Sequence, residues 1–250
     1  MSVSTFCAYV LMLAFGAAYC LVACVPWLLA LLLPARLRGR VMRVLIYGFG
    51  RTIVFAAIRP FARVRFEDRS EGSRDAEVYV FNHRSASDPF LMSALGRWNM
   101  VQFVNGWPMR LWFFGYYARL CEYVDVTRMP FEKQVSHVRG LISRGAAVIA
   151  FPEGHRSCSR RQGPFHSGIF RIARELGLSL CPCAIAGNED IPDRRFRFRR
   201  RGRVIVRRLK TLSAEEVLAF DSAHALKRRV WELISAEAGK MDKELDGHEI

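Results

Sequence analysis

A long uncharged segment at the start of the chain constrains what it can fold into more than any other feature. The stretch from Thr5 to Leu33 contains no charged residue. Because a helix rises about 1.5 Å per residue, roughly 20 residues cross the hydrocarbon core of a bilayer. A basic cluster follows, and positive flanking residues stay on the cytoplasmic side of a membrane. We therefore expect an anchor in the inner, cytoplasmic membrane, with the rest of the chain facing the cytoplasm. The basic residues are Arg36, Arg38, Arg40 and Arg43.

A second apolar segment, from Val41 to Pro60, is interrupted by Arg43, Arg51 and Arg59. This pattern favours an amphipathic helix at the membrane interface over a second span. The two segments are compatible with a hairpin that enters one leaflet, or with a single full span followed by an interfacial helix. A cleaved signal peptide is disfavoured, since no positive residue precedes the apolar run. Residues 1–60 are therefore predicted to form membrane-anchoring helices.

The chain from Phe61 onward has the length and the alternating pattern of one α/β domain. About 190 residues remain, which is enough for a single core. Apolar runs typical of buried strands alternate with helical patterns, such as those at 132–144 and 167–176. This alternation predicts a mostly parallel sheet flanked by helices. We place this domain at residues 61–238 and a polar, frayed tail at residues 239–250.

A histidine and an aspartate follow the first of two apolar runs that are typical of short buried strands. The run at 78–81 leads into Asn82-His83-Arg84-Ser85-Ala86-Ser87-Asp88. An Asp that accepts the proton of one His ring nitrogen fixes the tautomer and leaves the other nitrogen free as a general base. His83 and Asp88 can meet if the chain bends between a strand and a helix that begins at Asp88-Pro89. The plainer alternative is that Asp88 only caps that helix.

An acid and a base flank a glycine after the second apolar run, at 148–151. The sequence there is Phe151-Pro152-Glu153-Gly154-His155-Arg156-Ser157. Functional residues of α/β sheets collect at the carboxyl ends of the strands, so the two polar segments are predicted to form one site. The alternative is an ordinary strand-to-loop turn built on the proline and the glycine, with Glu153 and Arg156 as a surface ion pair.

Two further segments complete a pattern of four blocks. Tyr123–Arg128 is predicted to be a strand ending in arginine, and Leu180–Gly187 a buried strand that carries a proline. In their order and spacing the four blocks, over residues 78–187, resemble the glycerolipid acyltransferase family, whose best-known member acylates lysophosphatidic acid. The resemblance implies acyl-CoA or acyl-carrier protein as co-substrate, with no other cofactor. It also implies that the acceptor hydroxyl attacks the thioester directly.

The resemblance further implies roles for individual residues. His83 would be the general base and Asp88 its partner. Because a planar guanidinium grips phosphate with two hydrogen bonds, arginines would bind the acceptor's anionic head group. Two positions depart from the family pattern: His155 stands where threonine is common, and His166 stands where lysine is common, which removes a fixed positive charge. The substrate-binding residues implied in this way are Asn82, Arg128, Glu153, Gly154, Arg156 and Ser157.

The charge balance favours a partnership with anionic lipid. Lys plus Arg exceed Asp plus Glu by 38 − 23 = 15, and a basic protein with a membrane anchor is expected to contact membrane lipids. The run from Arg194 to Arg203, where Phe alternates with Arg, also fits a platform for single-stranded nucleic acid. We expect no nucleic-acid partner, because that interpretation leaves the anchor and the four blocks unexplained. The cysteines lack Cys-x-x-Cys spacing, and we expect no metal.

Taken together, these features predict a membrane-associated acyltransferase that uses acyl-CoA or acyl-carrier protein. The expected acceptor is the hydroxyl of a lysophospholipid such as 1-acyl-sn-glycerol 3-phosphate. One alternative is an acyltransferase for a different lipid acceptor, either an amino-acid lyso-lipid or a polyene. Another is a non-catalytic, basic membrane-binding protein that keeps the fold without turnover.

Overall fold

The computed structural model describes residues 2–73, 75–198 and 202–247. Its centre is a seven-stranded sheet with the order β1-β7-β6-β2-β5-β3-β4. Neighbouring strands are parallel throughout, except that β6 and β7 are antiparallel. The prediction of a mostly parallel sheet is confirmed. The strands are β1 (Ala62–Asp68), β2 (Val78–Phe81), β3 (Met100–Val104), β4 (Val124–Asp125), β5 (Ala147–Ala150), β6 (Leu180–Ala186) and β7 (Gly202–Arg208).

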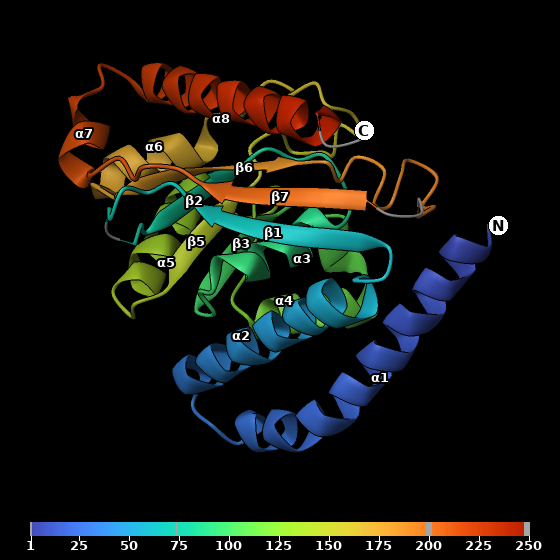
Figure 1. Ribbon diagram of the computed structural model, residues 1–250. Helices are drawn as coiled ribbons and strands as arrows, with labels where there is room; N and C mark the ends of the chain where they lie inside the picture. The colour runs from blue at the N-terminus through green and yellow to red at the C-terminus, as the bar shows by residue number, and fades with distance from the viewer. Residues whose placement is uncertain (1, 74, 199–201, 248–250) are drawn as a thin grey trace.

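Helices cover both faces of the sheet (Figure 1). All four residues of β2 are buried, because Val78 and Val80 pack into one core while Tyr79 and Phe81 pack into the other. Because both faces of the central strands are buried, their sequences are continuous apolar runs and do not alternate between apolar and polar residues. One face carries α5 (Phe131–Ile142), α6 (Gly168–Leu176), α7 (Ala214–Ala219) and α8 (Ala223–Asp246). The other carries α2 (Ala35–Thr52), the π-helical turn η1 (Ile53–Ala57), α3 (Asp88–Leu91) and the 3-10 turn η2 (Met92–Leu95).

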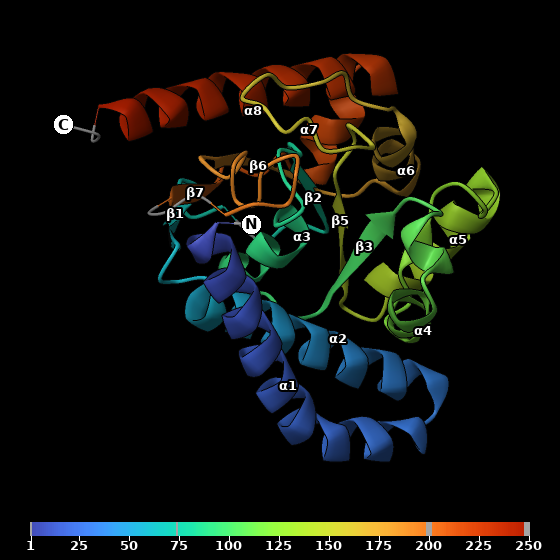
Figure 2. The ribbon, with the colours of Figure 1, turned by 90° about the vertical axis from the view of Figure 1, so that its right-hand side faces the viewer.

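The uncharged segment forms α1 (Val3–Leu31), the outermost helix of the molecule. It is the one helix among the described residues that is long and apolar enough to cross a membrane. It forms a hairpin with α2, and Figure 2 shows α1 leading away from the sheet and α2 returning to it. Near the hairpin's turn, the Trp27 ring lies 6.5 Å from that of Tyr116 and 6.4 Å from that of Tyr117, both in α4 (Trp112–Leu120), which follows the short turn η3 (Pro108–Arg110).

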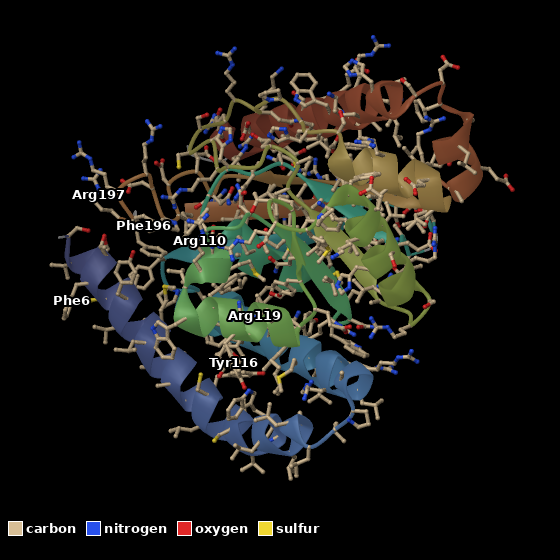
Figure 3. All side chains as sticks on the ribbon, turned by 180° about the vertical axis from the view of Figure 1, so that it is seen from behind. Phe6, Arg110, Tyr116, Arg119, Phe196 and Arg197 are labelled. Carbon is tan, nitrogen blue, oxygen red and sulfur yellow. The ribbon has the colours of Figure 1, made fainter. Side chains whose placement is uncertain are left out.

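The first turns of α1 are hydrogen-bonded to the α/β domain. The Ser4 hydroxyl donates to the carbonyl of Phe198 at 3.0 Å, and the Phe198 N–H donates to the Thr5 hydroxyl at 3.0 Å. The Tyr9 hydroxyl donates to the carbonyl of Phe196 at 2.8 Å. Figure 3 shows Phe196 and Arg197 beside the start of this helix. Both ends of α1 therefore lie against the same domain.

Three sequence predictions need correction at the level of elements. The helix predicted from Val41 begins at Ala35, and its Arg43 is buried rather than interfacial, 2.7 Å from the carboxylate of Glu122. The frayed tail predicted at 239–250 is instead helical as far as Asp246, with Met241 fully buried, and residues 248–250 lie outside the described residues. The predicted boundary at residue 60 falls within a packed unit, since Val54 belongs to the same core as β2.

Candidate active site

The polar segments singled out in the sequence meet at the carboxyl edge of the sheet. The strands β2, β5, β3, β4 and β6 run in one direction, so their carboxyl ends share one edge, where α/β proteins place their sites. His83 follows β2 and Glu153 follows β5, while Arg128 follows β4. The single strand predicted at Tyr123–Arg128 is shorter than expected. It stops at Asp125, whose carboxylate accepts from the backbone N–H groups of Thr127 and Arg128 at 3.0 and 3.1 Å.

His83 and Asp88 form a hydrogen-bonded pair. Nδ1 of His83 lies 2.6 Å from Oδ2 of Asp88, and the chain bends between β2 and α3 as the pair requires. Asp88 is fully buried, and Oδ2 also accepts from the backbone N–H groups of Arg84 and Ser85 at 2.7 and 3.0 Å. A carboxylate with these donors accepts the proton of Nδ1, which leaves Nε2 as the basic nitrogen. The helix cap is Ser87, so the carboxylate of Asp88 serves the loop rather than the helix.

The ring of His83 packs against an aromatic side chain and remains accessible. Its centroid lies 4.8 Å from that of Phe151, and its side chain is 18% exposed. The accessible imidazole beside a fully buried carboxylate has the arrangement of a general base and the group that orients it.

Glu153 braces the backbone of the His83 segment. The residue is 2% exposed, and its two carboxylate oxygens accept from the N–H groups of His83 at 2.7 Å and Gly163 at 2.8 Å. Burial raises the pKa of Glu153, and the two backbone hydrogen bonds oppose that shift. The N–H of Ser157 donates to the carbonyl of His83 at 2.8 Å. Glu153 is thus a buried residue that holds the backbone at His83 and Gly163 in place, and it does not form the surface ion pair that was the alternative interpretation.

Asn82 was expected to bind substrate, and the structure places its amide elsewhere. The side-chain Nδ2 donates to the carbonyl of Ile185 at 2.9 Å, and Oδ1 accepts from the N–H of Ile185 at 2.8 Å. The residue is 1% exposed. Its amide therefore fastens the end of β2 to β6, and it fixes the starting point of the His83 segment.

Arg156 lies on an aromatic ring. Its guanidinium is 4.3 Å from the ring centroid of Phe196, which is itself 49% exposed. A guanidinium stacked in this way keeps its N–H groups free in the plane of the fork. Gly154, two residues earlier, has φ of +74°, and a Cβ there would lie 3.2 Å from the ring of His166. Only a glycine fits this bend without strain.

The turn that carries Arg128 is connected to Gly154 through the end of β3. The amide of Asn105 donates to the carbonyl of Gly154 at 3.1 Å. The next residue, Gly106, is so close to the turn that a Cβ would meet the hydroxyl of Thr127 at 2.2 Å. Arg128 itself is exposed. These contacts place the loop that carries Arg128 and the loop that carries Arg156 at the same edge of the sheet.

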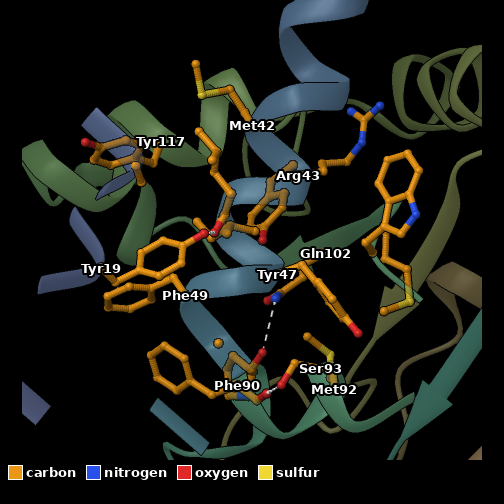
Figure 4. Close-up of a pocket in the computed structure, with 18 of the residues that line it drawn as sticks. Tyr19, Met42, Arg43, Tyr47, Phe49, Phe90, Met92, Ser93, Gln102 and Tyr117 are labelled. Carbon is orange, nitrogen blue, oxygen red and sulfur yellow. Dashed lines mark hydrogen bonds between the residues drawn. The ribbon is translucent and has the colours of Figure 1, made fainter. Parts of the chain in front are cut away.

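An apolar cavity of about 530 Å³ lies beside this edge, between the sheet and the hairpin of α1 and α2. Figure 4 shows side chains from several helices converging on it, including Tyr19, Phe49 and Phe90. Pro89 and Phe90, which line it, directly follow Asp88. The lining thus includes the two residues that follow Asp88 in the chain, although neither His83 nor Asp88 belongs to it. Sequence analysis could not locate it, because its lining comes from segments that lie far apart in the chain.

Asn188 and Gly163 are the residues of this site that sequence analysis missed. Asn188 is fully buried and donates to Oδ1 of Asp88, and Gly163 supplies the second N–H to Glu153. Neither stands in a recognisable motif, although Asn188 directly follows a glycine at the end of a predicted strand. Within the described part of the chain, no group of three or more His, Cys, Asp or Glu residues is arranged to hold a metal ion.

The chain is similar in sequence to known acyltransferases. The sequence model of the family described as Acyltransferase matches residues 63–186. The chain is 29% identical over 150 residues to a chloroplast 1-acyl-sn-glycerol-3-phosphate acyltransferase of Arabidopsis thaliana, covering 54% of this chain and 39% of the relative. It is 32% identical over 127 residues to a Brassica napus protein of the same description, covering 46% and 34%. The chain spans well under half the length of these curated relatives.

The crystal structure of the 1-acyl-sn-glycerophosphate acyltransferase PlsC from Thermotoga maritima has the same fold. The TM-score is 0.68 at 18% sequence identity, and the match covers 94% of this chain and 97% of that one. The likeness therefore extends over nearly the whole chain.

Proposed function

We propose that this chain, which belongs to the glycerolipid acyltransferase family, transfers a fatty acyl group from acyl-CoA or acyl-carrier protein to the hydroxyl of a lysophospholipid such as 1-acyl-sn-glycerol 3-phosphate. One observation carries the proposal. The accessible His83 is oriented by the buried Asp88 at 2.6 Å, and the two residues after Asp88 line an apolar cavity of about 530 Å³. The names of the similar plant and bacterial proteins support the same reaction class.

The geometry supports a direct transfer with His83 as general base. Nε2 takes the proton of the acceptor hydroxyl while its oxygen forms a bond to the thioester carbonyl carbon. Collapse of the tetrahedral intermediate breaks the C–S bond, and the proton passes from His83 to the leaving thiolate. Asp88 stabilises the imidazolium that exists between these steps. No covalent acyl-enzyme is required.

The apolar cavity is proposed to hold an acyl chain during the transfer. Its lining is mostly aliphatic and aromatic, with Arg43, Arg97 and Gln102 among the polar exceptions, and it is bounded by α1, the helix proposed to lie in the membrane. Burial of each methylene contributes about 0.8 kcal/mol, so a long chain would be held mainly by this contact. A chain seated there would have its carboxyl end toward Pro89 and the His83–Asp88 pair.

Arg156 and Arg128 are proposed to bind the phosphate of the acceptor. The guanidinium of Arg156 lies on the ring of Phe196 and donates no hydrogen bond to the other described residues, and Arg128 is exposed at the end of a neighbouring loop. Charge-assisted hydrogen bonds from guanidinium to phosphate are about twice as strong as neutral ones. This arrangement favours an acceptor with a phosphomonoester over a neutral glyceride.

We further propose that the chain binds the cytoplasmic membrane through one leaflet. Exposed apolar side chains cover the outer surface of α1, while both of its ends contact the α/β domain. A helix with both ends tied to one domain cannot carry them to opposite sides of a bilayer. The hairpin interpretation of the sequence is therefore preferred to a full span. The exposed side chains include Leu13, Leu21, Val22, Val25 and Leu29.

The proposed reaction is tested with the purified full chain in mixed micelles and a long-chain acyl-CoA or acyl-carrier protein. Lysophosphatidic acid and its dephosphorylated monoacylglycerol compete as acceptors, and the products are separated by mass. We expect phosphatidic acid to form with the larger kcat/KM. Equal use of the two acceptors would overturn the phospholipid assignment, and absence of transfer to both would favour a different acceptor class or a non-catalytic membrane-binding protein.

A further inference from the structure

The turn after β6 is fastened to the His83–Asp88 segment. Gly187 has φ of +82°, and a Cβ there would lie 2.1 Å from the carbonyl oxygen of Arg203, so the chain can turn this tightly only at glycine. The hydroxyl of Ser85 donates to the carbonyls of Ile191 and Pro192 at 3.1 and 3.0 Å. This turn presents Asn188 to the buried side of the pair.

Asn188 completes the set of donors around the carboxylate of Asp88. Its Nδ2 donates to Oδ1 of Asp88 and lies 3.3 Å from the hydroxyl of Ser87. The other oxygen, Oδ2, accepts from His83 and from the N–H groups of Arg84 and Ser85. Asn188 thus binds Oδ1 of Asp88, the carboxylate oxygen that receives no hydrogen bond from the His83–Ser85 segment.

The side chain of Asn188 is costly to bury. It is fully buried, and its Oδ1 has no hydrogen-bond partner among the described residues. A buried acceptor without a partner lowers the stability of the fold. The favourable contribution of this amide therefore resides in the hydrogen bonds of Nδ2, and the stronger of these is made to an ionised carboxylate.

We propose that Asn188 is a positioning residue for the His83–Asp88 pair. Rotation about the Cβ–Cγ bond of Asp88 moves both carboxylate oxygens, so the donor at Oδ1 adds to the restraint that the donors at Oδ2 place on this torsion. With this torsion restrained, Oδ2 faces Nδ1 of His83, which keeps the tautomer that leaves Nε2 basic. This inference rests on the proposed function, since it concerns the base of that reaction.

Two variants of the full chain test the inference. Asn188→Ala removes the donor, and we expect kcat to fall about tenfold, as for loss of one hydrogen bond to a charged group, with the KM values for lysophosphatidic acid and acyl-CoA within about twofold. Asn188→Asp is nearly isosteric and donates only when one of the two adjacent carboxyls is protonated. Since two such carboxyls raise the pKa of one of them, the variant regains the donor at lower pH.

The pH profile separates positioning from mere support of the fold. We expect the ratio of kcat for Asn188→Asp to that for wild type to rise as the pH is lowered from about 8.5 to 6, while the ratio for Asn188→Ala stays flat, because its lost donor does not titrate. Circular dichroism at each pH verifies that both variants are folded. Wild-type kcat in Asn188→Ala, or a ratio for Asn188→Asp that is independent of pH, would overturn the inference.

His83→Ala, assayed in parallel, distinguishes the two possible failures. If His83→Ala is inactive and Asn188→Ala is as active as wild type, only the positioning role is wrong. If His83→Ala turns over at the wild-type rate, His83 is not the general base, and the positioning role proposed for Asn188 is then also wrong.

Discussion

At the scale of single residues, His83 is the accessible side chain of the segment after β2, and buried neighbours fix its position. His83 is 18% exposed on its side chain, while Asn82, Ser85 and Asp88 are buried and engaged in hydrogen bonds. Glu153 adds a bond to the backbone of His83 from a different strand end. The accessible imidazole is therefore held through its ring, its backbone and its neighbours.

The first prediction concerns the arginine that is stacked on Phe196. Arg156→Ala should raise the KM for lysophosphatidic acid by one to two decades, because a charge-assisted hydrogen bond contributes roughly 1.5–3 kcal/mol. The KM for monoacylglycerol should change little. Arg156→Lys should recover only part of the loss, since an ammonium cannot form the planar fork. Steady-state kinetics with both acceptors measure these effects.

Arg228→Ala serves as the matched control for this variant. Arg228 is an exposed arginine of α8, paired only loosely with Glu232 at 4.0 Å, so its removal alters the net charge equally without touching the site. An equal rise in KM for Arg156→Ala and Arg228→Ala would show that the net charge, rather than a phosphate contact, governs the acceptor.

At the scale of elements, α2 is fastened to the domain by a buried ion pair. Arg43 of α2 is 2% exposed and lies 2.7 Å from Glu122, and its Nε donates to the side-chain oxygen of Asn99 at 2.8 Å. Glu122 also pairs with Arg144 at 2.8 Å. Burial raises the pKa of Glu122, but the hydrogen bonds and charges of Arg144 and Arg43 together lower it below its ordinary value.

The second prediction follows from the sign of this shift. Because the pKa of Glu122 is lower in the folded than in the unfolded state, its ionised form adds stability above the unfolded pKa, and this stability is lost as the pH falls through the folded pKa. Glu122→Gln should lower the free energy of unfolding by about 2 kcal/mol near pH 7. The deficit should shrink as the pH falls below about 4.5.

Denaturant unfolding of the full chain in micelles, followed by circular dichroism, measures this deficit at each pH. The control is Glu232→Gln, which removes an exposed carboxylate in a loose helical pair and should change stability by less than about 0.5 kcal/mol. A deficit for Glu122→Gln that is the same at about pH 3 and pH 7 would show that ionised Glu122 does not stabilise the packing of α2.

Elements were predicted correctly where the local sequence pattern agrees with the packing. Predictions failed where contacts between residues distant in sequence determine the end of a helix or the burial of a side chain. The helices predicted at 132–144 and 167–176 are formed at Phe131–Ile142 and Gly168–Leu176, and the strand at 78–81 is fully buried. The end of α8 was misjudged because Asp242, polar by sequence, forms a buried pair with Arg84 at 2.7 Å. Arg43 looked interfacial for the same reason, since its partner Glu122 is distant in sequence.

The same limit applies to the site. His83 and Asp88 were predicted because both lie in one short segment, and a short-range bend suffices to join them. Asn82 was assigned to the substrate, whereas its partner is the backbone of Ile185 on another strand. Asn188 could not be found at all, because its contact with Asp88 depends on how the end of β6 is placed beside β2.

At the scale of the whole molecule, the position of α1 determines how the protein meets the membrane. The start of the helix is hydrogen-bonded to the domain through Ser4, Thr5 and Tyr9, and its end continues into α2, which packs beneath the sheet (Figures 1 and 2). The apolar cavity lies between this hairpin and the sheet. An acyl chain could therefore pass from the leaflet to the cavity without crossing water.

The third prediction tests this placement in sealed vesicles. Single cysteines are introduced at Ser2 and at Arg36, which flank α1, in a background whose exposed cysteines are serine. With the domain outside, both positions should react with a membrane-impermeant maleimide, because both ends of the helix lie on one side. Leu218→Cys, on α7 and 52% exposed, reports the orientation of the domain. A full span would protect Ser2→Cys until detergent is added.

The proposed function depends above all on His83 acting as the base of an acyl transfer. The most direct measurement is the single-turnover rate of acyl transfer from acyl-CoA to lysophosphatidic acid by wild type and by purified His83→Ala in the same micelles. Removal of a general base costs about 10²- to 10⁴-fold, and we predict a loss in this range with the circular dichroism spectrum unchanged. If folded His83→Ala transfers acyl groups at the wild-type rate, His83 is not the general base.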